Sequence, residues 1–477
     1  MNRKQFVNTI LTPLLLPIIN ACKNKSSISK PLANNQPIAS ISNEYEPVTY
    51  FKKGDAEYEF LRKGFNKRIN KYPAVIALCK STEDVQQAVK YARKYKLPIS
   101  IKSGGHSFEG YSCNDQGMVI NCSSFNSIKW IDENTILVNP GCLIKDLYKE
   151  ILPKNKILPA GSCGGVGLGG LTLGGGYGLF SRKYGLTCDH LSELTLVNAN
   201  GNIVNSTNNP DILWACRGGG NGNFGVITEM KFQLQDISPL IVCSRFTTRK
   251  PTNQRTVEIL KQWFNITENL PSCCFSAFVY NGRNIYILLT NIDHQNTPCQ
   301  EEVSQLKILS DNTLTSNPLK ISNAVTQFYG LKNPVFFKNS SVGLYDRFEN
   351  IEPFIKGVVE KISNSKGIIF QVNTLGGNII NADFEKASAY PHRNKKWLSE
   401  LQTYWQTDEK TSNMIRNFDE TKALFKEAQG AQYCNYPDAD NADWQHKYYG
   451  SNYERLQKIK RSIDPENIFT FHQSIET

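Results

Sequence analysis

The most informative part of the sequence is a glycine-rich stretch, Gly161-Ser-Cys-Gly-Gly-Val-Gly-Leu-Gly-Gly-Leu-Thr-Leu-Gly-Gly-Gly-Tyr-Gly178. Its Gly165-x-Gly167-x-x-Gly170 has the spacing of a dinucleotide-binding loop that opens a helix. Three consecutive glycines begin at Gly174, where that helix would run, and each interior glycine costs roughly 1 kcal/mol relative to alanine. We therefore expect a glycine-lined loop that wraps around a ligand, and not a Rossmann domain.

A second glycine turn lies upstream, at the end of a predicted β-α-β unit. Residues 75–78 and 99–101 are short apolar runs typical of strands. Between them, Ser81 and Asp84 form a capping-box start for a helix over 81–97. The second strand leads into Lys102-Ser-Gly-Gly-His-Ser107, whose bare backbone amides can approach a phosphate closely.

The composition limits the class of protein. The 477 residues are 40% hydrophobic and 20% charged, which excludes a disordered polymer and suits two or three domains. The net charge is +11, but five of the positive residues lie in the first thirty residues, which contain no acid. Because the remainder has no basic run, we expect no nucleic-acid partner.

The N-terminus has the pattern of an export signal. Arg3 and Lys4 precede an apolar stretch over 6–19, which is too short to span a bilayer. The sequence that ends at Cys22 resembles a bacterial lipobox, and the basic start resembles a loose twin-arginine signal. We expect 1–22 to be a lipoprotein signal with lipid on Cys22, 23–50 to be a flexible tether, and the protein to be lipid-anchored at the cell envelope, periplasmic or surface. A plain secretory signal with a chance cysteine is the alternative.

The thirteen cysteines lie scattered through apolar contexts, where cysteine usually acts as a small core residue. The chain has no Cys-x-x-Cys pair, so we expect no metal site. No disulfide pattern follows from the spacing.

Several motifs in one order resemble a known family. They are 102–107, 161–167, 174–178, 213–226, 431–438, 449–453 and 464–469. Together they resemble the berberine bridge enzyme-like FAD oxidases of the vanillyl-alcohol oxidase/p-cresol methylhydroxylase superfamily. The resemblance implies an α+β fold. A two-subdomain FAD-binding domain over 51–237 would be completed by the C-terminal segment 444–477. A substrate domain, an antiparallel sheet with helices, would be inserted over 238–443.

The resemblance also implies how FAD is held. His106 matches the residue that bonds the 8α carbon of the flavin, and Cys163 matches a second link to C6. Their alternatives are a hydrogen-bonded loop histidine and a small core cysteine. Val166 matches the small residue that, in the family, allows oxygen to reach the flavin. The alternative is that Val166 only packs against its neighbours. Further cofactor-binding residues would be Ser103, Gly104, Gly105, Ser107, Gly167, Gly170, Gly175, Tyr177, Gly178, Gly225, Val226 and Asn435.

Oxidation of an alcohol needs a base for the O–H proton. The resemblance implies Tyr436 as the first candidate, with Tyr433 nearby, and Glu400 as the second. A phenol at its ordinary pKa near 10 is a poor base at pH 7 and needs help. Carbohydrate-oxidising members of the family often carry an Asp, which can activate the tyrosine, where this chain has Asn373. This difference favours Glu400 as the base. Strand alternation places Glu400 and Gln402 on one face, although either could be a solvated strand residue. Gln371, Asn373 and Gln402 are the predicted substrate-binding residues.

The leading functional hypothesis is a monomeric oxidase of an alcohol, with a sugar or oligosaccharide hemiacetal as substrate and O2 as electron acceptor. The alternative on the same fold is an oxidase or dehydrogenase of amines, alkaloids or phenolic natural products. A third hypothesis is a surface binding lipoprotein with a degenerate flavin site.

Overall fold

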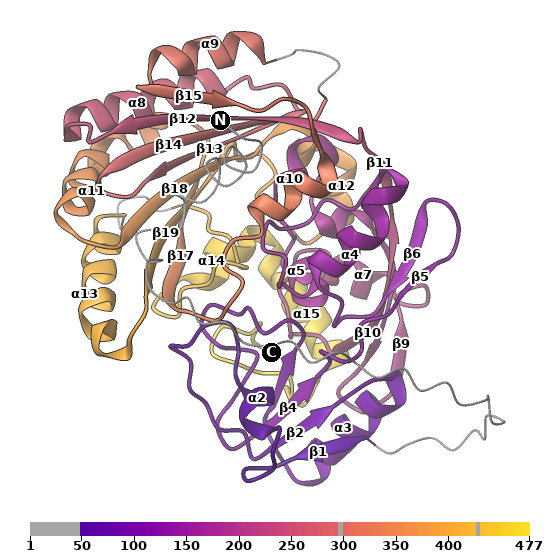
Figure 1. Ribbon diagram of the computed structural model, residues 1–477. Helices are drawn as coiled ribbons and strands as arrows, with labels where there is room; N and C mark the ends of the chain where they lie inside the picture. Colours follow the sequence, from indigo (N-terminus) through magenta and orange to yellow (C-terminus); the bar gives the residue numbers. More distant parts are fainter. Residues whose placement is uncertain (1–47, 294–298, 426–429) are drawn as a thin grey trace, which may run out of the picture.

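The structure is a computed structural model that describes residues 48–293, 299–425 and 430–477 (Figure 1). The predicted signal and most of the predicted tether lie outside these residues. The architecture combines helices with largely antiparallel sheets, so the predicted α+β fold class is confirmed. None of the described helices is long and apolar enough to cross a bilayer.

The first sheet has the order β1-β2-β4-β3. Its strands are β1 (Thr49–Phe51), β2 (Val75–Leu78), β3 (Ile99–Lys102) and β4 (Met118–Asn121). The predicted helix is α3 (Thr82–Lys94), and the capping box between Ser81 and Asp84 is present. The β-α-β unit is confirmed, but β4 lies between its two strands and pairs in parallel with both. This order places the Lys102–Ser107 turn at the edge of the sheet.

The second sheet is antiparallel and has the order β5-β6-β10-β8-β9. Its strands are β5 (Ile128–Trp130), β6 (Thr135–Val138), β8 (Leu191–Val197), β9 (Ile203–Asn205) and β10 (Val226–Gln233). Helix α3 packs against β4 of the first sheet and against β8 and β10 of the second. The apolar face of α3 therefore joins the two sheets through one core.

The glycine tract does not form a Rossmann unit. It is preceded by β7 (Lys156–Ile157), a two-residue strand that pairs antiparallel with β11 (Gln235–Asp236). Only one and a half turns of helix follow, α5 (Leu168–Leu173), before the chain enters Gly174–Gly176. At Gly176 the backbone has φ +82°, and a Cβ would meet the Thr187 hydroxyl at 2.2 Å. The other helices of this half are α2 (Tyr58–Arg62), α4 (Ile144–Ile151), α6 (Ser181–Tyr184) and α7 (Pro210–Cys216).

The third sheet is large and antiparallel, with the order β15-β12-β14-β13-β18-β19-β17 and β16 beside β12. Its strands are β12 (Leu240–Arg249), β13 (Cys274–Tyr280), β14 (Asn284–Asn291), β15 (Asn312–Thr315), β16 (Leu319–Lys320), β17 (Phe336–Tyr345), β18 (Ile368–Thr374) and β19 (Trp397–Trp405). The predicted domain boundary at 237/238 falls between β11 and β12.

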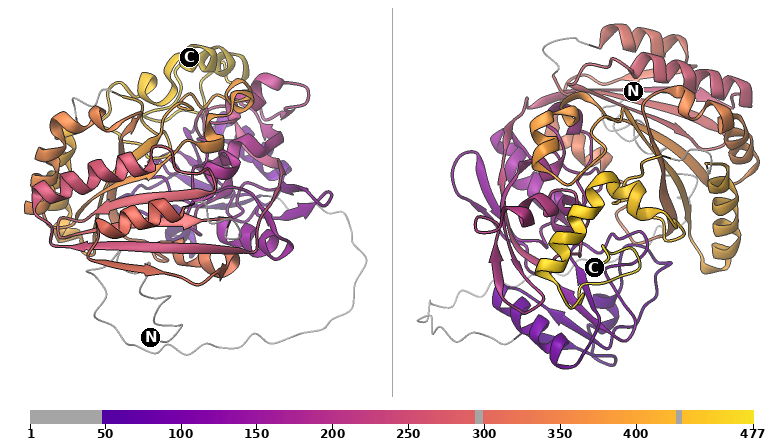
Figure 2. Two further views of the ribbon diagram at one scale, coloured as in Figure 1. Left: turned by 90° about the horizontal axis from the view of Figure 1, so that it is seen from above. Right: turned by 180° about the vertical axis from the view of Figure 1, so that it is seen from behind.

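Helices cover the outer face of this sheet (Figures 1 and 2). They are α8 (Asn253–Thr267), α9 (Gln300–Ile308), α11 (Glu352–Asn364) and α13 (Thr411–Lys422), with α10 (Ile321–Phe328) and α12 (Ala382–Ala387) nearer the first half of the chain. Trp397 and Leu401 of β19 pack under the outer helices, so their neighbours Leu398 and Glu400 point to the opposite face. A disulfide that was not predicted joins Cys274 of β13 to Cys299.

The C-terminal segment returns to the first half of the chain (Figure 2, right). It contains α14 (Trp444–Tyr449) and α15 (Tyr453–Ile463). The Lys460 ammonium is fully buried and donates to the Asp464 carboxylate at 2.6 Å and to the Asn223 carbonyl at 2.7 Å. This buried pair ties the end of the chain to the 220–225 loop.

Candidate active site

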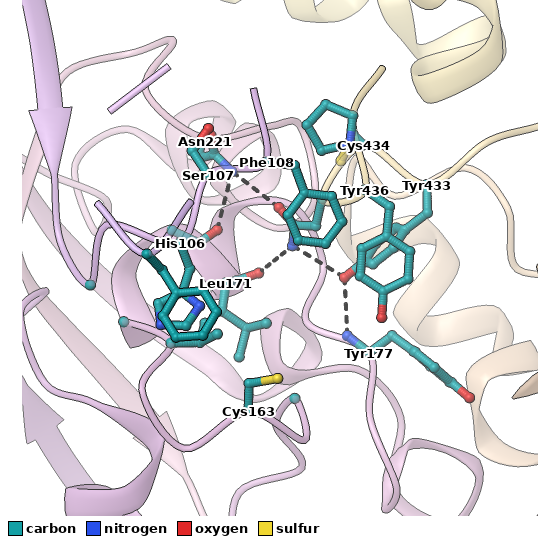
Figure 3. Close-up of a pocket in the computed structure, with 18 of the residues that line it drawn as sticks. His106, Ser107, Phe108, Cys163, Leu171, Tyr177, Asn221, Tyr433, Cys434 and Tyr436 are labelled. Carbon is teal, nitrogen blue, oxygen red and sulfur yellow. Dashed lines mark hydrogen bonds between the residues drawn. The ribbon is translucent and has the colours of Figure 1, made fainter. Parts of the chain in front are cut away.

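A cavity of about 430 Å³ separates the glycine loops from the inner face of the large sheet. The 102–107 turn, the 161–179 tract and the 220–225 loop line it on one side, and β17, β18 and β19 line it on the other. Residues 433–437 also line it (Figure 3). The cavity therefore brings together residues that lie more than three hundred positions apart in the sequence.

His106 lies on the cavity wall with its ring held between two neighbours. The Phe65 ring stacks on it, with centroids 4.3 Å apart and planes 16° apart. On another side, a Cβ at Gly165 would lie 2.9 Å from Nε2 of His106, so only glycine fits there. Burial lowers the pKa of His106 to about 4, and the ring is therefore neutral and nucleophilic at ordinary pH.

Cys163 lines the same cavity and is partly buried. Desolvation raises the pKa of its thiol to about 11, and the nearby Glu400 carboxyl adds to the increase. The thiol is therefore protonated at neutral pH. Gly330, from the loop that follows α10, lies against it, since a Cβ at Gly330 would be 3.4 Å from the Cys163 sulfur.

The tyrosine segment is clamped onto the glycine tract (Figure 3). The Tyr433 hydroxyl accepts hydrogen bonds from the amides of Gly176 at 3.0 Å and Tyr177 at 3.1 Å. Nδ2 of Asn435 donates to the same hydroxyl at 3.1 Å and to the Leu171 carbonyl at 3.0 Å. Because backbone and amide donors occupy its oxygen, Tyr433 has a geometry that suits positioning rather than proton abstraction.

Tyr436 is placed differently, with its ring stacked on Phe108 at a centroid distance of 5.4 Å. Burial raises its pKa well above 10, and the carboxyl of Glu400 and the hydroxyl of Tyr433 raise it further. Tyr436 is therefore a neutral phenol that can donate a hydrogen bond, and its surroundings do not activate it as a base.

Glu400 lies on β19 with 5% of its surface exposed. Desolvation raises the pKa of its carboxyl to about 8, while hydrogen bonds from Gln402 and Asn339 act in the opposite direction. A carboxyl with a pKa near the working pH can both accept and release a proton. This carboxyl is the group in the cavity whose protonation best suits a general base.

A strip of amide side chains surrounds Glu400 on the sheet. Gln371 of β18 stands opposite Glu400 in the strand register, and Asn339 of β17 stands opposite Gln402. Asn373 lies on the same face, two residues after Gln371. The alternation that the sequence predicted for Glu400 and Gln402 is confirmed, and both side chains are buried in the cavity wall.

Two of the residues predicted to bind the cofactor lie outside the cavity lining. Gly175 adopts φ +114° and packs against the Tyr390 ring, and Val226 is fully buried in the core under α3. The other predicted cofactor and substrate residues line the cavity. The cavity is also lined by residues that the sequence did not predict: Asn339 and an aromatic group made of Phe65, Phe108, Phe337 and Tyr404. The alternation Phe337-x-Asn339 indicates that these two side chains share one face of β17, but it does not indicate which face meets the cavity.

The residues present fit a bound FAD. Both predicted attachment residues face one cavity, and its wall is largely glycine backbone that a long, flat ligand can approach. A Cβ at Gly170 would meet no atom within 4 Å, because it would project into the open cavity. Among the described residues, no group of His, Cys, Asp and Glu side chains could hold a metal ion.

Comparisons with known proteins find relatives of this chain among FAD-linked oxidoreductases. The family profile "FAD binding domain" matches residues 73–207, and the profile "Berberine and berberine like" matches residues 432–476. The chain is 31% identical over 438 residues to the FAD-linked oxidoreductase YgaK of Bacillus subtilis, covering 89% of this chain and 95% of YgaK. It is 28% identical to a monolignol oxidoreductase of Arabidopsis thaliana, covering 82% of each chain.

Solved structures show the same fold. The BBE-like 1 protein of Physcomitrella patens superposes with a TM-score of 0.81 at 24% identity, covering 90% of this chain and 97% of that one. A chitooligosaccharide oxidase gives the same score, identity and coverage.

Proposed function

The chain belongs to the berberine bridge enzyme-like family of FAD-linked oxidoreductases, and we propose that it oxidises an alcohol with O2 as electron acceptor. The proposed alcohol is the hemiacetal group of a sugar or oligosaccharide. The observation that carries the proposal is the buried Glu400 carboxyl, set among amide side chains in the cavity that His106 and Cys163 also line.

In this proposal, Glu400 and Tyr436 have different roles in the oxidation. Glu400, when ionised, takes the proton of the substrate hydroxyl, and Tyr436 is placed to hold the substrate oxygen by donating a hydrogen bond. Bound FAD would supply the acceptor for the hydride of the carbon that carries this hydroxyl, and O2 would take up the two electrons with two protons as H2O2. The substrate alcohol thus loses one hydride and one proton and becomes a carbonyl, or a lactone if it is a hemiacetal.

The amide strip favours a polyhydroxylated substrate. Its side chains offer neutral hydrogen-bond donors and acceptors, which suit the hydroxyl groups of a substrate and add no charge beside Glu400. They belong to Gln371, Asn373, Gln402 and Asn339. A similar structure is named as a chitooligosaccharide oxidase, which is consistent with this class. The aromatic group is the observation that favours the second candidate, a phenolic alcohol, and one relative is named as a monolignol oxidoreductase.

A substrate screen separates the two candidates. Oxygen consumption and H2O2 release should be measured with mono- and oligosaccharides, cinnamyl-type alcohols and benzylisoquinoline alkaloids at equal concentration. We expect equimolar oxygen uptake and peroxide release with a sugar. Turnover with aromatic alcohols alone would favour the second candidate, and reduction of the cofactor without oxygen uptake would identify a dehydrogenase.

We further propose that FAD is attached through both His106 and Cys163. Each link replaces a C–H bond of the flavin and an N–H or S–H bond of the side chain by one C–N or C–S bond. The two hydrogens that each link releases reduce one O2 to H2O2. Acid-precipitated protein should therefore stay yellow. His106→Ala and Cys163→Ala should each retain acid-stable flavin, and the double variant should lose all of it. Cys434→Ala, a control at another cysteine of the cavity wall, should match wild type. A colourless wild-type pellet would disprove covalent attachment.

Val166 is the proposed determinant of oxygen use. It lines the cavity in the loop that also contains Cys163, and its carbonyl is fixed by the Ile144 amide. We expect Val166→Leu to slow reoxidation by oxygen while leaving anaerobic reduction by substrate unchanged. Stopped-flow absorbance measures both half-reactions separately. An unchanged oxygen rate would assign Val166 to packing alone.

A further inference from the structure

Gln402 contacts the Glu400 carboxyl through one end of its amide only. Nε2 of Gln402 donates to Oε2 of Glu400 at 2.7 Å and to Oε1 of Gln371 at 3.3 Å. Both hydrogens of the amide nitrogen are therefore directed at acceptors. Rotation of the amide by 180° would bring its oxygen against the carboxylate and against the Gln371 oxygen, which is repulsive.

The orientation of Gln371 is fixed in turn by its neighbour on β18. Nε2 of Gln371 donates to Oδ1 of Asn373 at 2.8 Å, which leaves Oε1 of Gln371 to face Gln402. The three amides thus form a row in which Gln402 donates in both directions, to Glu400 and to Gln371, and Gln371 donates onward to Asn373. Strand register supports this row, since Gln371 stands opposite Glu400 and Asn373 stands opposite Leu398.

The ionisable groups around Glu400 come from three elements. Tyr404 lies on β19, Tyr436 on the 433–437 segment and Cys163 on the glycine tract. Burial raises the pKa of each group, and the Glu400 charge raises it further. All three are neutral near pH 8, so none offers a positive charge. The bonds that favour the ionised form of Glu400 come from amides, that of Gln402 at 2.7 Å and that of Asn339.

We propose that Gln402 is a positioning residue that holds the Glu400 carboxylate ready to accept the substrate proton, and that Gln371 and Asn373 set the direction of its amide. The proposal rests on the proposed role of Glu400. At the far end of the row, the Asn373 side chain accepts the bond from Gln371 and is itself uncharged.

The first test is the pH profile of kcat/KM for Gln402→Met, which keeps the length of the side chain and removes the donor. We expect its midpoint to move up by about one pH unit, so that activity falls about tenfold at pH 7 and recovers as the pH rises. Gln371→Leu should shift the midpoint in the same direction by less. Thr403→Val is the matched control, because Thr403 is buried on β19 but points to the opposite face.

The second test does not depend on turnover. The infrared band of protonated carboxyl groups, followed in substrate-free holoenzyme above pH 6.5, should contain a component that is absent in Glu400→Gln. We expect this component to persist to higher pH in Gln402→Met than in wild type. Equal midpoints in the two proteins would overturn the proposal. A shifted infrared midpoint with an unshifted kinetic profile would uphold the contact and instead overturn Glu400 as the base.

Discussion

Replacing Glu400 by Gln should slow substrate-driven anaerobic reduction of the bound FAD by about 10²- to 10⁴-fold, the usual contribution of a general base. The substitution preserves the shape of the side chain in a site where it is almost fully buried. Only the ability to take a proton is removed, so substrate binding should change little. Stopped-flow absorbance of the flavin under anaerobic conditions measures the effect, with KM reported separately from kcat.

The same base predicts the pH dependence of the wild-type protein. The Glu400 carboxyl, with its pKa raised to about 8, must be ionised to act, so kcat/KM should rise with pH and level off above a midpoint near 8. Glu400→Gln should lose this rise. Tyr436→Phe is the comparison that separates the two candidate bases, because it removes a hydrogen-bond donor and leaves the carboxyl in place. A larger loss in Tyr436→Phe than in Glu400→Gln would make Tyr436 the base.

The sequence predicted elements whose signals are local. The capping residues around Ser81 mark the start of α3, and the short apolar runs at 75–78 and 99–101 mark β2 and β3. The position of β4 between β2 and β3 was not predictable in this way, because strand order depends on pairing between distant segments.

The candidate site shows the same division. Motifs place His106 and Cys163 on loops, and alternation places Glu400 and Gln402 on one face of a strand. Alternation cannot say which face of β17 meets the cavity, so Asn339 was missed. Nor can it distinguish Tyr433 from Tyr436, since only the fold reveals that one hydroxyl is held by backbone amides while the other ring stacks on Phe108. The pKa of Glu400 likewise depends on burial between strands that the sequence does not pair.

A second large effect is expected at the fully buried pair of Lys460 and Asp464. The Asp464 carboxylate accepts the Lys460 ammonium and the amides of Ile468 and Phe469, and the ammonium also donates to the Phe469 and Asn223 carbonyls. Desolvation lowers the pKa of Lys460 even with this partner beside it. Asp464→Asn would leave the ammonium buried without its counter-charge, which typically costs about 3–5 kcal/mol of unfolding free energy.

The loss should appear in both stability and cofactor retention, because Lys460 holds the 220–225 loop that lines the cavity. Denaturant unfolding followed by circular dichroism gives the first quantity, and flavin release from the His106→Ala, Cys163→Ala background gives the second. Asp211→Asn is the matched control, because it breaks the exposed ion pair between Asp211 of α7 and Arg455, which lies on α15 as Lys460 does. This substitution should lower the unfolding free energy by less than about 1 kcal/mol. Equal losses for Asp464→Asn and Asp211→Asn would mean that the buried pair does not tie the C-terminal segment to the cofactor loop.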